Sequence, residues 1–137
     1  MSAPLVYSVI ESPAHPALTD LYRRLGMEEL RLNSVRKAIS QLKKRPPDWV
    51  VADFAYGYAN NYAGVNVSNL DVLLSSLRRY APRARVVVLV DKAEYQYVDK
   101  LKALFTVHAV LQYPVQAAQM ETLLAGDGTA PAAADDV

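Results

Sequence analysis

The stretch Trp49-Val50-Val51-Ala52-Asp53 holds four apolar residues followed by a single acid. Such a run is typical of a β-strand that helices cover on both faces of its sheet. Val86–Val90 is a second run of this kind, with four valines and one leucine, and we expect it to lie inside the sheet. Two strands of this type indicate a buried parallel sheet, so the segments around them decide how that sheet is connected.

The rest of the chain alternates between strand-like and helix-like patterns. Further β-rich runs predict strands at 5–10, 27–32 and 107–111. Apolar residues at three- and four-residue spacing predict helices at 17–25, 35–42, 70–80, 93–105 and 115–124. This alternation predicts an α/β fold with a five-stranded, doubly wound parallel sheet whose two faces are covered by helices.

Short polar residues and glycine mark where the helices begin and end. Gly26 can supply the left-handed turn that ends the first helix. Asn33 or Ser34 is expected to cap the second helix, and Ser68 or Asn69 the third.

Length and composition limit the classes of protein that the chain can represent. Its 137 residues predict one domain over 1–125, followed by a flexible tail over 126–137 that has almost nothing to bury. The absence of cysteine excludes disulfides and thiolate chemistry. A formal net charge of +1 gives no reason to expect nucleic acid or an anionic membrane as a partner. Without a long apolar run or a targeting segment at the start, the expected location is the cytoplasm.

Three acids follow predicted strands and would meet at one edge of the sheet. They are Glu11, Asp53 and Asp91. Ligands in open α/β sheets bind outside the carboxyl ends of the strands, so this edge is the expected site. Neighbouring carboxylates repel one another unless a cation lies between them, which makes Glu11 and Asp53 candidate ligands for Mg²⁺. The alternative is that these acids are solvated or cap the next helix, as Asp91 could do.

From Leu5 to Leu124 the order of elements resembles the receiver domains of two-component response regulators, the CheY-like family. The resemblance is strongest at 48–53, 86–90 and 110–114, and it implies a flavodoxin-like, receiver-like three-layer sandwich. It implies that Asp53, which closes the third strand, is the phosphoryl acceptor. It also implies that Mg²⁺ is held by an acidic pair after the first strand, which is reduced here to the single acid Glu11.

Two departures from the receiver pattern change the expected chemistry. Receivers place a serine or threonine after the fourth strand, where this chain has Asp91, and a lysine before the proline after the fifth strand, where Tyr113 precedes Pro114. Phosphoryl transfer needs cations around the phosphoryl oxygens, so a lost lysine and a gained carboxylate both oppose it. Lys92 is the candidate replacement cation. The chain is therefore interpreted as a degenerate or pseudo-receiver with impaired phosphorylation.

A further departure is the long, uncharged segment 54–69 between the third strand and the third helix. It contains Tyr56, Tyr58 and Tyr62 among asparagines and glycines, which is typical of recognition loops. The alternative is a self-packed surface loop without a partner.

The predicted function is that of a non-enzymatic, stand-alone signalling module that binds another signalling protein. The resemblance also suggests a homodimer through the fourth helix, fifth strand and fifth helix, a face where Tyr95 and Tyr97 can contribute contacts. One alternative is a working phosphoacceptor, with Asp53 phosphorylated, Glu11 holding Mg²⁺ and Lys92 as the cation. Another is a small flavodoxin-like ligand-binding protein that uses the tyrosines of 54–69.

Overall fold

The computed structural model describes residues 3–56 and 68–125. Its strands are β1 (Leu5–Val9), β2 (Glu28–Leu32), β3 (Trp49–Asp53), β4 (Arg85–Val90) and β5 (Ala109–Gln112). Its helices are α1 (Thr19–Arg24), α2 (Val35–Gln41), α3 (Asp71–Tyr80), α4 (Val98–Lys102) and α5 (Ala117–Ala125), with the 3₁₀ helix η1 (Lys92–Tyr97) directly before α4.

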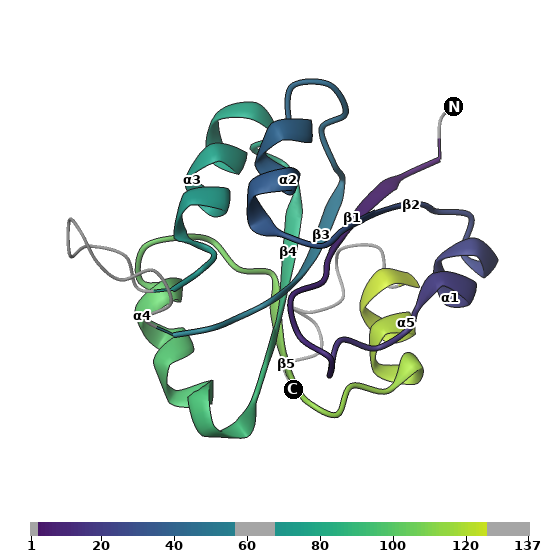
Figure 1. Ribbon diagram of the computed structural model, residues 1–137. Helices are drawn as coiled ribbons and strands as arrows, with labels where there is room; N and C mark the ends of the chain where they lie inside the picture. Colours follow the sequence, from purple (N-terminus) through teal and green to yellow (C-terminus); the bar gives the residue numbers. More distant parts are fainter. Residues whose placement is uncertain (1–2, 57–67, 126–137) are drawn as a thin grey trace.

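The five strands form one parallel sheet in the order β2-β1-β3-β4-β5. Figure 1 shows α2, α3 and α4 on one face of this sheet and α1 and α5 on the other. The predicted fold class is confirmed. The order reverses between β1 and β3, so the carboxyl ends of these two strands mark the point where an open α/β sheet offers a binding crevice.

Alternating side chains of each strand contribute to two separate cores. On the α2/α3/α4 face, Val50 and Val88 pack with helix residues such as Leu73 and Leu101. On the α1/α5 face, Val51 and Leu89 lie in a second cluster with Leu18, which precedes α1, and with buried residues of α1 and α5. The helix residues are Leu21, Tyr22, Met120 and Leu124. Burial of both faces explains why β3 and β4 read as apolar runs.

Several local predictions agree with the structure. β3 has the predicted bounds Trp49–Asp53, and β4 lies inside the sheet, although β3 takes the middle position. Ser34 caps α2 by accepting a hydrogen bond from the Lys37 backbone N–H. Gly26 has a φ of 76°, in the left-handed region.

Two local predictions agree only in part. The N-cap position of α3 is Leu70, two residues beyond Ser68, but Oγ of Ser68 still accepts from the backbone N–H of Leu70 (3.0 Å) at the start of the helix, whereas Asn69 belongs to the site described below. The single helix expected over 93–105 is divided into η1 and α4. Aromatic residues lose rotamer freedom in an α-helix, and Tyr97 of η1 is held by stacking on Tyr56.

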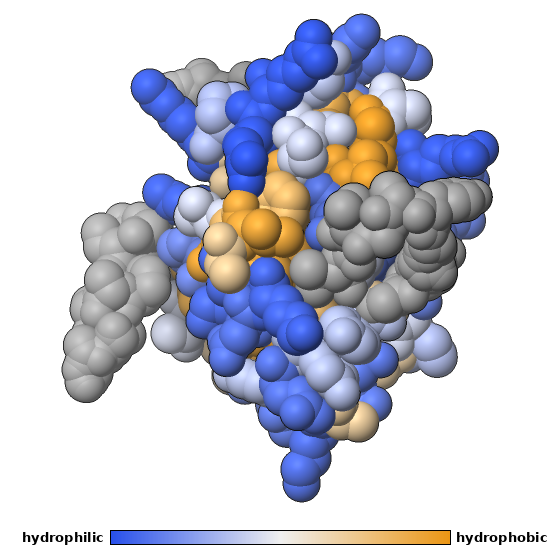
Figure 2. All heavy atoms as spheres, turned by 90° about the vertical axis from the view of Figure 1, so that its left-hand side faces the viewer, coloured by the Kyte–Doolittle hydropathy of each residue, from blue (hydrophilic) through white to orange (hydrophobic). Residues whose placement is uncertain are grey.

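The outer surface on the side of α3 and α4 is mixed in character. Figure 2 shows hydrophilic side chains over most of this view, with apolar groups in separate patches between them. Within the part of the chain that the structure describes, no helix is long and apolar enough to cross a membrane. The predicted tail, 126–137, lies outside the described residues.

Candidate functional site

The carboxylate of Asp53 lies at the carboxyl end of β3 and is buried, with 3% of the residue exposed. Its Oδ2 accepts hydrogen bonds from the backbone N–H groups of Glu11 (2.8 Å) and Ser12 (3.0 Å). These donors come from the loop after β1, the strand next to β3 in the sheet. The neighbouring strand thus brings two fixed donors to the one acid at the end of β3.

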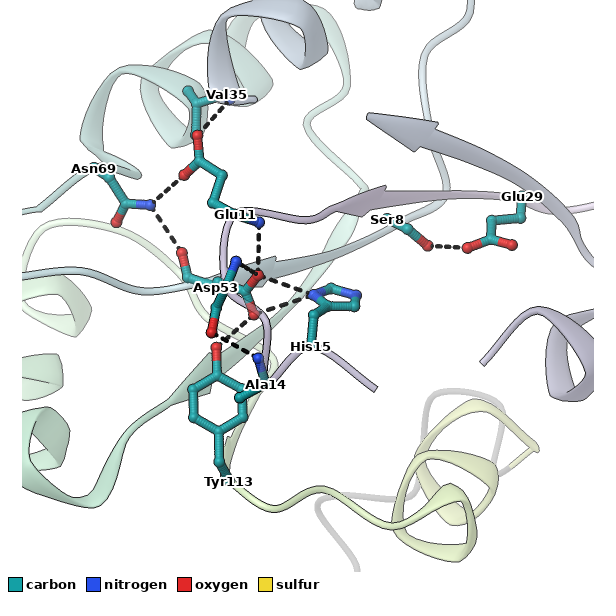
Figure 3. A network of polar contacts seen from close by, with 10 residues as sticks. Ser8, Glu11, Ala14, His15, Glu29, Val35, Asp53, Asn69 and Tyr113 are labelled. Carbon is teal, nitrogen blue, oxygen red and sulfur yellow. Dashed lines mark hydrogen bonds and ion pairs between the residues drawn. The ribbon is translucent and has the colours of Figure 1, made fainter. Parts of the chain in front are cut away.

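Two side chains complete the shell around this carboxylate. Nδ1 of His15 lies 3.0 Å from both carboxylate oxygens of Asp53. The hydroxyl of Tyr113, at the end of β5, donates to Oδ1 at 2.5 Å. Figure 3 shows the imidazole and the phenol approaching Asp53 from different segments of the chain. We call Asp53, His15, Tyr113 and the two backbone N–H groups the Asp53 clamp.

The clamp is desolvated as well as fully hydrogen-bonded. Only 3% of the His15 side chain and 4% of the Asp53 side chain are exposed. Burial raises the pKa of Tyr113 above its usual value. The hydrogen bond to Asp53 and the negative charge of that residue raise it further, while a hydrogen bond from Ser12 acts weakly in the opposite direction. Tyr113 is therefore held in its protonated form, in which it can donate to the carboxylate.

The carboxylate of Glu11 has different partners. Its Oε1 accepts from Nδ2 of Asn69 (2.8 Å) and its Oε2 from the backbone N–H of Val35 (3.0 Å). Nδ2 of Asn69 also donates to the backbone carbonyl of Asp53 (2.8 Å). Asn69 thus connects the end of β3, the loop after β1 and the approach to α3, as Figure 3 shows.

The predicted magnesium ligands, Glu11 and Asp53, are both occupied by protein donors. Asp53 is surrounded by four hydrogen-bond donors, and the two carboxylate oxygens of Glu11 accept from two other donors. In residues 3–56 and 68–125, no three His, Asp or Glu side chains gather so that they could hold a metal ion. The two carboxylates do not fit a shared magnesium ion in this arrangement, and Mg²⁺ stays a prediction.

The four predicted switch residues differ in whether they contact Asp53. Tyr113 contacts Asp53 directly, and the Tyr113–Pro114 peptide bond is cis. Asp91 and Lys92 are exposed at the end of β4. Asp91 acts on the site only through its charge, which raises the pKa of Tyr113. Lys92 makes no ion pair with any described residue, so nothing in the structure brings its cation to Asp53.

Of the three tyrosines predicted to recognise a partner, only Tyr56 is described; Tyr58 and Tyr62 lie outside the described residues. The Tyr56 ring stacks on that of Tyr97, with centroids 3.8 Å apart and planes 9° from parallel. The Tyr56 backbone N–H donates to Oε1 of Glu94, at 3.1 Å. These contacts join the end of the β3 segment to η1, while the Tyr56 residue stays 38% exposed.

Sequence reasoning missed two members of the site. His15 follows the first strand in a loop between Pro13 and Pro16, at the edge where the site was expected, but its pairing with Asp53 joins residues far apart in the chain. The position of that loop was the available signal. The position of Asn69 before a helix predicts a capping role, which short polar residues at such positions usually perform, and gives no sign of its contact with Glu11.

No protein-family model matches the sequence, and no curated protein matches it either. Solved structures are similar in fold. The receiver domain of AraT, a response regulator from Geobacillus stearothermophilus, shares 15% identity, with 92% of each chain covered and a TM-score of 0.68. A CheY-like receiver domain from Methylobacillus flagellatus shares 19% identity, with 91% of this chain and 98% of that chain covered and a TM-score of 0.63.

A third structure comes from Pseudomonas aeruginosa and is the receiver domain of a sensor histidine kinase, with a magnesium ion coordinated in its active site cleft. It shares 14% identity, covers 90% of this chain and 95% of its own, and has a TM-score of 0.63. At these identities the likeness establishes architecture. The chain has the fold of the receiver domains of response regulators.

Proposed function

We propose that this chain is a receiver-like signalling module that acts by binding another protein in the cytoplasm, without enzymatic activity and without phosphorylation of Asp53. One observation carries the proposal: the carboxylate at the phosphoacceptor position is buried and already accepts hydrogen bonds from four protein donors. In this role Asp53 anchors the loop after β1 and the end of β5 to the centre of the sheet.

The clamp opposes phosphoryl transfer in two ways. An attacking carboxylate oxygen needs a free lone pair and an open path to the donor, whereas Oδ1 and Oδ2 are both engaged and the side chain is 4% exposed. A hydrogen bond to a charged group is worth about 1.5–3 kcal/mol, so opening several of them adds directly to the barrier. The product would also lack a neutralising cation, because Lys92 is not held near Asp53 and Asp91 adds negative charge on that side.

The binding surface that we propose is the face made by η1 and α4, which together replace the predicted fourth helix, with β5 and α5. Tyr95 is 45% exposed on η1, and Leu104 is 50% exposed just after α4. Exposed aromatic and aliphatic side chains of this kind often anchor protein interfaces. Another signalling protein or a second copy of this chain would bind there.

The phosphorylation claim can be tested by intact-mass spectrometry after incubation with acetyl phosphate and Mg²⁺. We expect no phosphoryl adduct on the natural chain. Asp53→Asn is the control, because it retains the shape of the side chain and removes the acceptor carboxylate. An adduct that forms on the natural chain and is lost in Asp53→Asn would show that Asp53 is a working phosphoacceptor and would overturn the proposal.

The interface claim needs a separate test. Light scattering across a concentration series, with and without Tyr95→Ala, measures self-association directly. Concentration-dependent dimers that Tyr95→Ala weakens would identify the second copy as the partner. A chain that stays monomeric would direct the search to other proteins, with Tyr95→Ala used as the matched non-binding variant.

A further inference from the structure

Two adjoining hollows lie beside the Asp53 clamp, where the strand order reverses. The larger has a volume of about 400 Å³, and its walls include Glu11, Ser34 and Asn69. The smaller, of about 280 Å³, is lined by Arg31 and Lys37 together with apolar residues at the ends of β1 and β2. Asn33 lines both, so the two hollows meet at this residue, and we call them together the groove.

One end of this groove carries a fixed negative charge. The carboxylate of Glu11 is held by Asn69 on one oxygen and by the backbone N–H of Val35 on the other. A carboxylate oxygen can accept two hydrogen bonds, so each oxygen keeps one acceptor position. Figure 3 shows Glu11 supported between these two partners, and the residue itself is exposed. It is an anion held in one place with capacity to bind a cation.

The other end carries positive charge. Lys37 is exposed and makes no ion pair with any residue in the described ranges. The Arg31 side chain is 58% exposed, but its guanidinium is already engaged: it donates to Oγ1 of Thr19 at 3.1 Å and pairs with the carboxylate of Glu29 at 3.7 Å. Between the two ends, the Asn33 side chain is exposed and has no hydrogen-bond partner among the residues described. The groove therefore offers an anion, an amide and the cation of Lys37 in sequence.

We propose that this groove binds a small zwitterion of the amino-acid class. Its ammonium group would lie on Glu11 and its carboxylate on Lys37, with Asn33 bonding to either group between them. A simple cation gains from Glu11 but is repelled by Lys37, and a simple anion gains from Lys37 but is repelled by Glu11. Mixed charge thus selects for ligands with both groups.

The inference rests on the proposed function in one respect. Because the clamp occupies Asp53, that residue offers no free acceptor to the groove, and Glu11 alone supplies the anionic end. Supporting bonds that fix Glu11 before binding lower the entropy cost of holding a ligand. A module regulated in this way would respond to a metabolite at the edge of the sheet where receivers respond to a phosphoryl group.

The test is a titration followed by amide NMR. The probes are 4-aminobutanoate and 6-aminohexanoate, which carry both charges at different spacings, with butylamine and butanoate as single-charge controls. We expect at least one zwitterion to shift the amides of residues 31–37 and to bind roughly tenfold more tightly than either control. Absence of shifts with both zwitterions, or equal binding of a single-charge control, would overturn the proposal.

Two variants test the two ends of the groove. Glu11→Gln removes the negative charge, and Lys37→Met removes one positive charge while leaving the bonds of Glu11 intact. Each is expected to weaken binding roughly tenfold, the usual effect of losing one charge-assisted contact. Lys44→Met, an exposed lysine that does not line this groove, is the matched control and should bind like the natural chain. Equal weakening in all three variants, or in none, would contradict the assignment.

The outcome is separable from that of the proposed function. Phosphorylation of Asp53 would overturn the proposed function even if the zwitterion binds. A chain without phosphorylation that also ignores both zwitterions would overturn only the ligand assignment.

Discussion

The two faces of the sheet bury different kinds of side chain. Toward α2, α3 and α4, the strands contribute aliphatic residues such as Val50 and Val88, which need no partner beyond close packing, together with Tyr7, whose hydroxyl donates to the backbone carbonyl of Arg45 (2.6 Å). Toward α1 and α5, the same strands also bury Ser8 and Asp53, and each of these requires a specific hydrogen-bond partner. The comparison suggests that the first face stabilises the fold and the second defines what this chain does with it.

A second buried acid on the α1/α5 face supports this division. Glu29 of β2 accepts from Oγ of Ser8 (2.5 Å) and from Oγ1 of Thr19 (2.7 Å), and its side chain is 8% exposed. Buried carboxylates are unfavourable unless they are fully hydrogen-bonded, and both acids on this face meet that condition. The clamp is therefore one of two polar clusters built into this core.

The largest effect is expected from removing the acid of the clamp. Asp53→Ala leaves His15, Tyr113 and two backbone N–H groups without an acceptor, so we expect the free energy of unfolding to fall by about 3–5 kcal/mol. Urea unfolding followed by Trp49 fluorescence measures this. Asp53→Asn keeps one acceptor oxygen and should lose less. A loss below about 1 kcal/mol in Asp53→Ala would show that the clamp does not stabilise the fold.

A substitution that creates a cavity in the core on the α2/α3/α4 face provides the comparison for Asp53→Ala. Leu73 of α3 is fully buried, and Leu73→Ala should lower the free energy of unfolding by about 3 kcal/mol through lost packing. Because this core is separate from the clamp, the amide and imidazole NMR signals of His15 should not move. Large changes at His15 in this variant would show that the two faces are coupled.

A smaller loss is expected when only one donor of the clamp is removed. Tyr113→Phe deletes the hydroxyl that bonds to Asp53 and should cost about 1.5 kcal/mol, the lower end for a hydrogen bond to a charged group. The double variant with Asp53→Asn tests whether the cost comes from that bond. If the stability losses of the two single variants simply add in the double variant, the cost of Tyr113→Phe does not come from its bond to Asp53.

The smallest expected effect is a loss of stability at alkaline pH. Burial raises the pKa of Tyr7 to about 12, and it also raises the pKa values of Tyr22 and Tyr113. A tyrosine whose pKa is higher in the folded state contributes its full stabilisation below about pH 10 and loses it as the pH rises through the folded pKa. Urea midpoints should therefore fall above about pH 10. Tyr113→Phe should reduce that fall, and an unchanged pH profile in this variant would contradict the assignment.

The apolar core could be predicted from the sequence because each of its strands is recognisable from adjacent residues. Trp49–Asp53 and Val86–Val90 show their burial in their own composition, and Ser34 shows its capping role in its position before a helix. Asp53 could be placed at the site for the same reason, as the one acid that ends a buried strand. Alternation of strands and helices then predicted a doubly wound parallel sheet, and the resemblance to receiver domains implied its architecture.

The clamp was not predictable because its contacts join distant parts of the chain. Tyr113 and Asp53 are 60 residues apart, and His15 and Asp53 are 38 apart. In the sequence, Tyr113 differs from the receiver pattern by standing where a lysine is expected, and no local signal shows that its hydroxyl reaches Asp53. Which donors surround a buried carboxylate depends on how loops cross the sheet edge, which periodicity does not encode.

The central claim is that the clamp keeps Asp53 from accepting a phosphoryl group. Amide NMR spectra recorded during addition of Mg²⁺ and then beryllofluoride, a phosphoryl mimic, test it most directly in the natural chain and in Asp53→Asn. The account predicts that the signals around residues 53, 91 and 113 stay unchanged in both proteins. Shifts at these residues in the natural chain that disappear in Asp53→Asn would contradict it.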